Sequence, residues 1–365
     1  MVCIVAFFIL CITSIFSARF RRPLKKAWAC LTKKVRLQKC ETGFKDDVKN
    51  SVLARVVMRR PELVKPLGVA MEVLAVVLVI VMVWSVAEVV KGGAAMIAFG
   101  TCDVRQPSAC VLGTGEACNI DGERLGFIES IRTGQPHRFV TNWFSEFGEA
   151  FSGIPVRFRN WDAMDYIPEN ASFYRDFDWG LPIALKILDP GCGVCRDSYL
   201  NKLDSGFMDR YNLAFLAYPI PGVQGEEWAF RNSYLIVRYI EAVRSVELEW
   251  FLELEEGEGE ILRTELATDW MIIDRLFTGF DEMGRQYQDA FNASYSAEEA
   301  EERLQSWLRE WGFSEEELEQ IVDRSRSGEV RATIETNMNV VDNVIRTKMI
   351  PTMIFDGRRW HGLYS

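Results

Sequence analysis

Residues 189–195 read Asp-Pro-Gly-Cys-Gly-Val-Cys, and this heptapeptide decides the fold that we expect for the chain. It follows residues 181–188, a short run rich in aliphatic side chains that is typical of a buried strand. The Pro-Gly pair ends that strand, so we expect a helix to begin at Cys192. Cys192 and Cys195 would then share the first turn of that helix.

The first thiol of the pair would lie where a helix leaves its backbone N–H groups without partners. Those donors and the helix dipole stabilise a thiolate, which lowers a thiol pKa from about 8.5 into a range of roughly 3.5–7.5. A thiolate is the species that attacks or leaves during thiol–disulfide exchange. The sequence therefore predicts that Cys192 is the reacting thiol and that Cys195 resolves it.

A Cys-x-x-Cys pair also occurs as half of a zinc site or as an inert structural bridge. A zinc site needs two further ligands, and the chain has only His137 and His361, which are not spaced as a ligand pair. We therefore expect no metal here. The surrounding strand, turn and helix favour redox chemistry.

Two further segments extend the pattern. Residues 213–219 form a second strand-like run, and residues 349–357 read Met-Ile-Pro-Thr-Met-Ile-Phe-Asp-Gly. Together with the dithiol and its strand, they resemble the DsbA-like branch of the thioredoxin superfamily over residues 181–365. The resemblance implies an α/β, thioredoxin-like fold in which Pro351 is cis and the backbone of Ile350 meets an extended substrate beside the sulfur atoms.

Residues 224–346 lie between the second strand and the proline, and they are too long for a structureless loop. Their apolar side chains recur at helical spacing, and Ser296 with Glu299 and Ser314 with Glu317 have the spacing of capping boxes. We expect a long helical insertion at this point. Such an insertion is the DsbA-like arrangement, and we expect it to form a lid and one wall of a substrate groove.

The resemblance also implies roles for the residues of the site. The catalytic residues would be Cys192, Cys195 and Pro351, and the substrate-binding residues would be Ile350, Gly193 and Val194. No cofactor is expected other than the redox-active disulfide Cys192–Cys195. The implied partners are proteins that carry thiols or disulfides, and a membrane redox protein that recycles the dithiol.

The chain departs from the family pattern at two positions that affect the chemistry. The dipeptide between the cysteines, Gly193-Val194, has no His and offers only backbone donors, so strong oxidising power is not implied. Lys186 stands six residues before Cys192, where this superfamily often has a buried acid. Its ammonium either favours the thiolate, which would make Lys186 a tuning residue, or reaches water along its own stem. Both alternatives stay open.

The first ninety residues bear on the compartment in which the dithiol works. Residues 1–18 carry no charged side chain, and residues 67–90 form a second apolar run, long enough to cross a hydrocarbon layer of about 30 Å. The loop between them, residues 19–66, holds 15 Lys or Arg against 4 Asp or Glu, whereas the chain from Lys91 onward holds 27 against 46. By the positive-inside rule this loop is cytoplasmic. We expect two transmembrane helices in the cell membrane, with the N-terminus and the C-terminal domain extracytoplasmic.

Two alternatives concern this N-terminal region. Residues 1–18 would also suit a cleaved signal, although a signal peptide has its positive charges before the apolar run rather than after it. The basic loop raises the question of nucleic-acid binding. Between two spans, however, a loop that faces the membrane explains its charge better, and we expect no nucleic-acid partner.

Residues 91–140 are expected to form an exported, loop-like connector that contains three cysteines. In an oxidising compartment two of them should pair. Proximity, together with the two cysteines that similar membrane-anchored proteins carry after the span, favours a structural disulfide between Cys102 and Cys110. Cys118 is then left over as a free thiol, a mixed-disulfide partner or a shuttle to Cys192, and the sequence leaves these roles open.

Residues 141–365 are expected to be the thioredoxin-like domain. The function that follows is that of a membrane-tethered, extracytoplasmic thiol–disulfide oxidoreductase that acts on protein thiols, with oxidation favoured by export. A reductase, isomerase or electron relay would use the same dithiol in the other direction. A non-catalytic membrane scaffold or metal-handling protein with this fold is the alternative from another class.

Overall fold

The computed structural model describes residues 64–104, 110, 116–120, 127–222, 227–255 and 266–363. The chain divides into two compact units, Met1–Val90 and Lys91–Ser365. The first predicted span, residues 1–18, lies outside the described residues, as does the basic loop up to residue 63. The dithiol and the segment around Pro351 both belong to the second unit.

A four-stranded mixed sheet forms the centre of the second unit. Its strands are β2 (Ile183–Leu188), β3 (Asn212–Ala217), β5 (Thr352–Phe355) and β6 (Arg358–His361), in the order β3-β2-β5-β6. β2 runs parallel to β3 and antiparallel to β5, and β5 and β6 are antiparallel neighbours. A parallel pair joined to an antiparallel hairpin in this order is the thioredoxin-like core that the sequence predicts.

Burial explains why the two parallel strands form where they do. Every residue of β3, and every residue of β2 after Ile183, is buried, as expected for strands that are covered on both faces. Because parallel neighbours need a crossover, the chain returns through α7 (Gly193–Asp204) and the short η5 (Phe207–Asp209). The β5–β6 turn uses Asp356 and Gly357, with φ of 49° and 71°, the left-handed pair that a two-residue hairpin favours.

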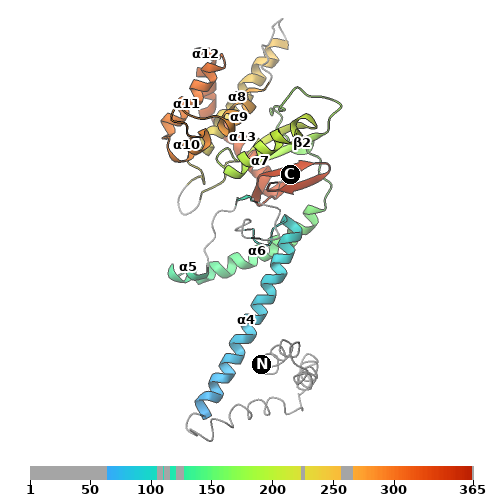
Figure 1. Ribbon diagram of the computed structural model, residues 1–365, viewed down its shortest axis with the longest axis vertical. Helices are drawn as coiled ribbons and strands as arrows, with labels where there is room; N and C mark the ends of the chain where they lie inside the picture. Colours follow the sequence, from blue (N-terminus) through green and yellow to red (C-terminus); the bar gives the residue numbers. More distant parts are fainter. Residues whose placement is uncertain are drawn as a thin grey trace. The chain divides into compact units, whose positions relative to one another are not determined.

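The insertion between β3 and the proline segment is helical, as predicted. Its described residues form α8 (Ser233–Glu255), α9 (Thr268–Thr278), α10 (Tyr287–Ala293), α11 (Ala297–Glu310), α12 (Glu315–Arg326), α13 (Gly328–Asn339) and the π-helical η6 (Val340–Ile345). Figure 1 shows α8 to α13 gathered into one group. Both predicted capping boxes are confirmed, at Ser296 and Ser314.

The residues before β2 pack onto the sheet and its turns. The short η4 (Met164–Tyr166) lies in this stretch, and Phe173 forms an isolated antiparallel bridge with Ala214 of β3. Trp161 is buried, and its backbone N–H donates to the carbonyl oxygen of Gly357 at 3.0 Å. This stretch therefore protects the outer edge of β3 and braces the β5–β6 turn.

Within the described residues, one helix is long and apolar enough to cross a membrane. It is α4 (Val64–Phe99), and its apolar span is Val76–Phe99. The span predicted at residues 67–90 falls on this helix, which continues beyond residue 90 to Phe99. The helix continues to Phe99 because the residues after the Gly92-Gly93 pair include Ala94, Ala95 and Ala98, which are strong helix formers.

The predicted connector, residues 91–140, is less loop-like than expected. It includes the end of α4, the short strand β1 (Cys118–Asn119), α5 (Phe127–Arg132) and the first residues of α6 (Pro136–Arg157). A Cβ atom added to Gly153 of α6 would lie 2.9 Å from the ring of Phe99, so only glycine allows this close approach.

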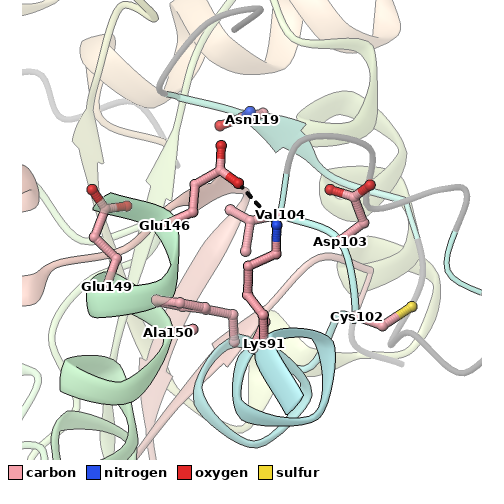
Figure 2. Close-up of a pocket in the computed structure, with 10 residues that line it drawn as sticks. Lys91, Cys102, Asp103, Val104, Asn119, Glu146, Glu149 and Ala150 are labelled. Atoms are coloured by element: carbon pink, nitrogen blue, oxygen red, sulfur yellow. Dashed lines mark hydrogen bonds and ion pairs between the residues drawn. The ribbon is translucent and has the colours of Figure 1, made fainter. Parts of the chain in front are cut away.

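A small pocket lies between the end of α4, α6 and the connector, as Figure 2 shows. Lys91 contacts Glu146 across it, with Nζ 3.3 Å from Oε2. Its volume of about 40 Å³ is room for a few water molecules at most, whereas ligand sites have volumes of roughly 300–1,000 Å³. This pocket is therefore a packing feature rather than a ligand site.

A buried ion cluster joins the helical insertion to the sheet. Arg244 of α8 donates to Glu241 at 3.0 Å, to Asp269 of α9 at 2.7 Å and to the carbonyl oxygen of Phe215 in β3 at 3.0 Å. All three charged side chains are fully buried. The cluster therefore depends on complete pairing, because a buried charge without its partner is costly.

We expect Arg244→Ala to lower the free energy of unfolding by about 3–5 kcal/mol, because it leaves two buried carboxylates without their counter-ion. The measurement is denaturant-induced unfolding of the full-length protein in detergent, followed by circular dichroism. Arg309→Ala is the matched control, since Arg309 pairs with Glu315 at 2.8 Å on the surface, where ion pairs contribute little. Equal losses in the two variants would contradict the assignment.

Candidate functional site

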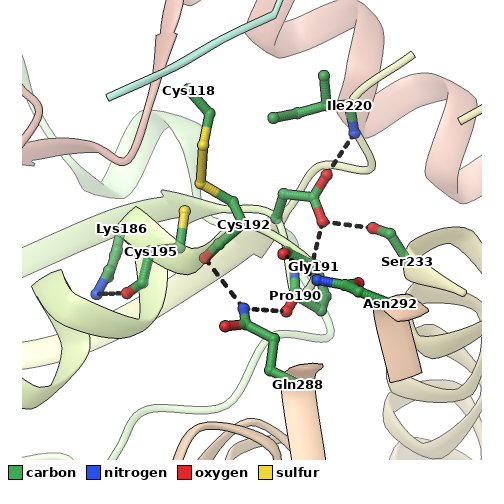
Figure 3. The surroundings of a disulfide bond; sticks show 11 residues. Cys118, Lys186, Pro190, Gly191, Cys192, Cys195, Ile220, Ser233, Gln288 and Asn292 are labelled. Atoms are coloured by element: carbon green, nitrogen blue, oxygen red, sulfur yellow. Dashed lines mark hydrogen bonds between the residues drawn. A yellow bond between two sulfur atoms is a disulfide. The ribbon is translucent and has the colours of Figure 1, made fainter. Parts of the chain in front are cut away.

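Cys192 lies where the chain has left β2 and α7 begins (Figure 3). It is the N-cap residue, with φ −78° and ψ 117°, and its carbonyl oxygen accepts from the N–H groups of Cys195 at 3.0 Å and Arg196 at 3.3 Å. The predicted start of the helix is confirmed. The N–H groups of Gly193 and Val194 belong to the first turn, where a helix provides no carbonyl partner for them.

A disulfide joins Cys192 to Cys118, as Figure 3 shows. Cys195 is a buried free thiol, so the disulfide expected between Cys192 and Cys195 is not the one present in this structure. Of the three roles left open for Cys118, the structure excludes a free thiol and joins this residue to Cys192, 74 residues later in the chain. Cys102 and Cys110 form the other disulfide, which is the pair expected for the connector.

The segment that carries Cys118 is held beside Cys192 by backbone pairing. β1 is antiparallel to β4 (Met349–Ile350), with Cys118 opposite Ile350 and Asn119 opposite Met349. The N–H of Ile120 continues the ladder by donating to the carbonyl oxygen of Lys348 at 3.2 Å. The peptide bond from Ile350 to Pro351 is cis, as the resemblance implies.

The turn before Cys192 is braced by the carboxylate of Asp189. This buried side chain accepts from the N–H groups of Gly191 and Ile220, each at 2.7 Å, and from the hydroxyl of Ser233. Burial raises the pKa of Asp189 to about 6, although its three donors act in the opposite direction. Asp189 therefore ties the end of β2 to the chain that follows β3.

Two amide side chains of α10 hold the same turn from the other side. Gln288 donates from Nε2 to the carbonyl oxygens of Pro190 at 2.7 Å and Cys192 at 3.0 Å. Asn292, one turn later, donates from Nδ2 to the carbonyl oxygen of Gly191 at 2.7 Å. Because residues four apart share one face of a helix, the two amides act together. The helical insertion thus contacts the cysteine turn directly (Figure 3).

Lys186 lies beneath the dithiol rather than reaching water. It is fully buried, and its Nζ donates to the carbonyl oxygen of Cys195 at 3.4 Å and lies 5.6 Å from the centre of the Tyr199 ring. Burial lowers the pKa of Lys186 to about 7, whereas the nearby Cys195 acts to raise it. Burial also raises the pKa of the Cys195 thiol to about 12, and Lys186 opposes that shift. From the sequence, Lys186 is expected either to favour the thiolate or to reach water, and the structure supports the first alternative, because the ammonium lies against the dithiol turn.

The buried His361 lies beside two threonines near Pro351. Nδ1 of the buried His361 lies 2.9 Å from Oγ1 of Thr352 and 3.1 Å from Oγ1 of Thr347. Burial lowers the pKa of His361 well below its usual value, so the ring is neutral. In the described part of the chain, no three His, Cys, Asp or Glu side chains are grouped as metal ligands.

The structure brings most of the predicted site residues together, and it adds others. Cys118 is bonded to Cys192 and lies opposite Ile350 in the β1–β4 pair, so these two predicted residues share one neighbour. Gly193 and Val194 are half-buried at the start of α7. Sequence reasoning did not find the parts played by Asp189, Gln288 and Asn292. The amides had one signal, their spacing of four residues, but their carbonyl partners lie about a hundred residues away in the sequence.

No protein-family model matches the chain, and no curated protein sequence matches it. Among solved structures, the thiol-disulfide exchange protein alpha-DsbA2 of Wolbachia pipientis is 15% identical, covering 55% of this chain and 85% of its own, with a TM-score of 0.34. A thioredoxin-like oxidoreductase of Silicibacter pomeroyi is 16% identical over 54% and 87%, with a TM-score of 0.32. DsbA of Pseudomonas aeruginosa is 14% identical over 52% and 77%, with a TM-score of 0.25. The fold itself rests on the strand order described above.

Two glycines of the turn differ in the space around them. A Cβ atom on Gly191 would overlap the side chain of Phe230, whereas a Cβ atom on Gly193 would meet no atom within 4 Å. We expect Gly191→Ala to lower the free energy of unfolding by about 1–3 kcal/mol, as overpacking does. Thermal unfolding of the full-length protein checks this, with Gly193→Ala as the matched control. A larger loss for Gly193→Ala would be evidence against this packing.

The buried lysine makes stability depend on pH in a defined direction. Between pH 7 and its ordinary pKa of 10.5, Lys186 is protonated in the unfolded chain but not in the folded one, so the free energy of unfolding rises with pH. Lys186→Met removes this dependence. We expect Lys186→Met to be more stable than the wild type at pH 6–7, and its advantage to shrink by up to about 1.4 kcal/mol per pH unit above pH 7.

Unfolding of both proteins at several pH values from 6 to 9 measures this difference. The pH dependence that comes from groups that do not interact with Lys186 is common to both proteins and cancels in the comparison, so the difference reports Lys186 together with its coupled partner Cys195. An advantage that stays constant with pH, or that grows above pH 7, would show that Lys186 is not buried with a lowered pKa.

Proposed function

We propose that this protein is a membrane-tethered, extracytoplasmic thiol–disulfide oxidoreductase that acts on protein thiols through Cys192 and Cys195. One observation carries the proposal. Cys192 is the N-cap residue of α7, and it is disulfide-bonded to Cys118 of β1. β1 is the strand that pairs with β4 just before Pro351. That geometry positions an extended polypeptide for disulfide exchange at Cys192.

The helix terminus supplies the chemistry. The unpaired N–H groups of the first turn and the helix dipole stabilise a thiolate at Cys192, which makes this sulfur both a good leaving group and a good nucleophile. Cys195 lies further into the helix, where burial raises the pKa of its thiol to about 12. Cys192 is therefore the sulfur that exchanges with substrate, and Cys195 is the resolving sulfur.

In the oxidative direction, a substrate thiolate attacks Cys192 of a Cys192–Cys195 disulfide. The bond between the two cysteines breaks, a mixed disulfide forms between substrate and Cys192, and Cys195 leaves and takes a proton. A second substrate thiolate then attacks the mixed disulfide, so that the substrate leaves oxidised and Cys192 is released. Two substrate thiols become one disulfide, and a membrane redox partner restores the Cys192–Cys195 bond.

The substrates are proteins in an extended conformation. β4 is only two residues long, and its pairing with β1 uses backbone hydrogen bonds rather than a shaped side-chain pocket. Backbone pairing is largely independent of the substrate's sequence. The site therefore fits many proteins that present a cysteine in an extended segment.

The direction of the reaction depends on compartment and on the dipeptide between the cysteines. Export, with the acidic part of the chain outside and α4 as one membrane span, favours oxidation. Gly193 and Val194 add no charged or polar side chain that would stabilise the Cys192 thiolate further, which leaves a reductase or isomerase as the second candidate.

The proposal predicts covalent capture of clients. We expect the full-length variant Cys195→Ala with Cys118→Ser to accumulate client proteins disulfide-bonded to Cys192, since neither internal thiol remains to release them. Nonreducing electrophoresis of isolated membranes, followed by reduction, measures the adducts. The control carries Cys192→Ala with Cys118→Ser, and adducts at or below its level would point to a non-catalytic scaffold.

A further inference from the structure

From the sequence, Cys192 is expected to bond Cys195, but in the structure it bonds Cys118, which lies much further away in the sequence. Cys195 lies three residues away and is a thiol, whereas Cys118 comes from another segment and is bonded. With this bond in place, both Cys192 and Cys195 have no exposed surface. An external thiol therefore has no access to the sulfur that the proposed function requires.

The backbone around Cys118 occupies the position that a substrate strand would take. Residues 116–120, which we call the internal strand, include β1, and β1 pairs with β4 directly before Pro351. Cys118 is opposite Ile350, so the sulfur leaves the strand at the position nearest the proline. The N–H of Ile120 adds a further hydrogen bond, to Lys348 at 3.2 Å.

The internal strand is also held by apolar contact. Ile120 is 5% exposed and belongs to the main hydrophobic core, and Cys118 is half-buried against the same core. Three kinds of contact thus hold one segment at one site: a disulfide, a short backbone ladder and a buried side chain. A surface bridge between two loops would not need the ladder or the buried isoleucine.

We propose that Cys118 is a third redox-active cysteine, and that the internal strand is a built-in substrate that bonds Cys192 and closes the site until thiol exchange displaces it. This inference rests on the proposed function and extends it. It defines a closed state, with a Cys118–Cys192 bond and a Cys195 thiol, and an open state, with a Cys192–Cys195 bond and a Cys118 thiol.

The two states have the same oxidation level. In opening, Cys195 loses its proton, its thiolate attacks Sγ of Cys192, and the bond from Cys192 to Cys118 breaks. Cys118 leaves as a thiolate and takes up a proton. One disulfide is present before and after, so no external oxidant or reductant is needed. The open state is the one that accepts substrate.

The surroundings of Cys195 explain why the closed state persists. The thiol is fully buried, and burial raises its pKa to about 12, so very little thiolate exists at neutral pH. Exchange depends on the thiolate fraction of the attacking sulfur. The buried Lys186 acts to lower the pKa of the Cys195 thiol and so favours its thiolate. That thiolate is the species that must form before the site can open.

Disulfide mapping tests the closed state directly. Full-length protein is purified in detergent, quenched with acid, alkylated and digested without reduction, and the linked peptides are identified by mass spectrometry. We expect a Cys118–Cys192 peptide in the wild type and a Cys192–Cys195 peptide in Cys118→Ser. A wild type that contains only the Cys192–Cys195 peptide would overturn the inference.

Kinetics test whether the internal strand closes the site. The probe is a synthetic extended peptide with two cysteines, and the measured quantity is its rate of oxidation in a single turnover by each protein. If about nine molecules in ten are closed, Cys118→Ser should react about tenfold faster than the wild type. A rise of less than threefold would contradict closure, and so would an equal rise in the control Cys102→Ser with Cys110→Ser, which removes the other disulfide of the connector.

The two assays separate the inference from the proposed function. If the wild type has the Cys118–Cys192 bond but keeps it unchanged through turnover with the probe peptide, the bond is inert and the inference fails while the enzyme stands. If Cys118→Ser forms the Cys192–Cys195 bond yet never oxidises or traps the peptide, the proposed function fails, and the inference fails with it.

Discussion

The position of the reactive sulfur depends on hydrogen bonds that reach the cysteine turn from outside it. The carboxylate of Asp189 holds two backbone N–H groups, and the amides of Gln288 and Asn292 hold three carbonyl oxygens of residues 190–192. Each buried polar group that lost its partner would cost about 1–3 kcal/mol, so the turn has little freedom to move. Because α10 supplies the amides, the helical insertion takes part in holding the cysteine turn.

The ionisable side chain buried beneath the dithiol is a lysine, Lys186, and the sign of its charge affects the thiol above it. An acid at position 186 would repel a thiolate at Cys195, whereas a lysine attracts it. The environment also makes both charges costly, since burial favours a neutral amine and a neutral thiol. The pair is therefore more stable either with both groups neutral or with both charged. A site built in this way suits a buried thiol that stays protonated at rest and ionises only during exchange.

Sequence predicted the parts of the fold that depend on local patterns. The strand before Cys192, the start of α7 and the two capping boxes are set by residues within a few positions of one another, so they could be read directly. The proline segment required the resemblance, because a lone proline does not reveal its isomer. The sequence could not decide between Cys195 and Cys118 as the partner of Cys192, because the position of Cys118 depends on the pairing of β1 with β4, between residues more than 200 positions apart. α4 runs on past the predicted apolar run 67–90 to Phe99, since the alanines after Gly92 and Gly93 continue the helix.

The length of the connector bears on how the internal strand works. Phe99, at the end of α4, packs against Gly153, which fixes one end of the connector in the same unit as the dithiol. A fully extended chain from Phe99 to Cys118 would span at most about 65 Å. The disulfide between Cys102 and Cys110, with its Cα atoms 5.7 Å apart, shortens that reach to roughly 45 Å. A displaced Cys118 therefore stays tethered to the unit that contains Cys192, and a tethered competitor acts at an effective concentration set by its tether. The connector disulfide changes this reach by less than a factor of two, so the tether as a whole, more than this one bond, sets how strongly the internal strand competes with a substrate in the proposed closed state.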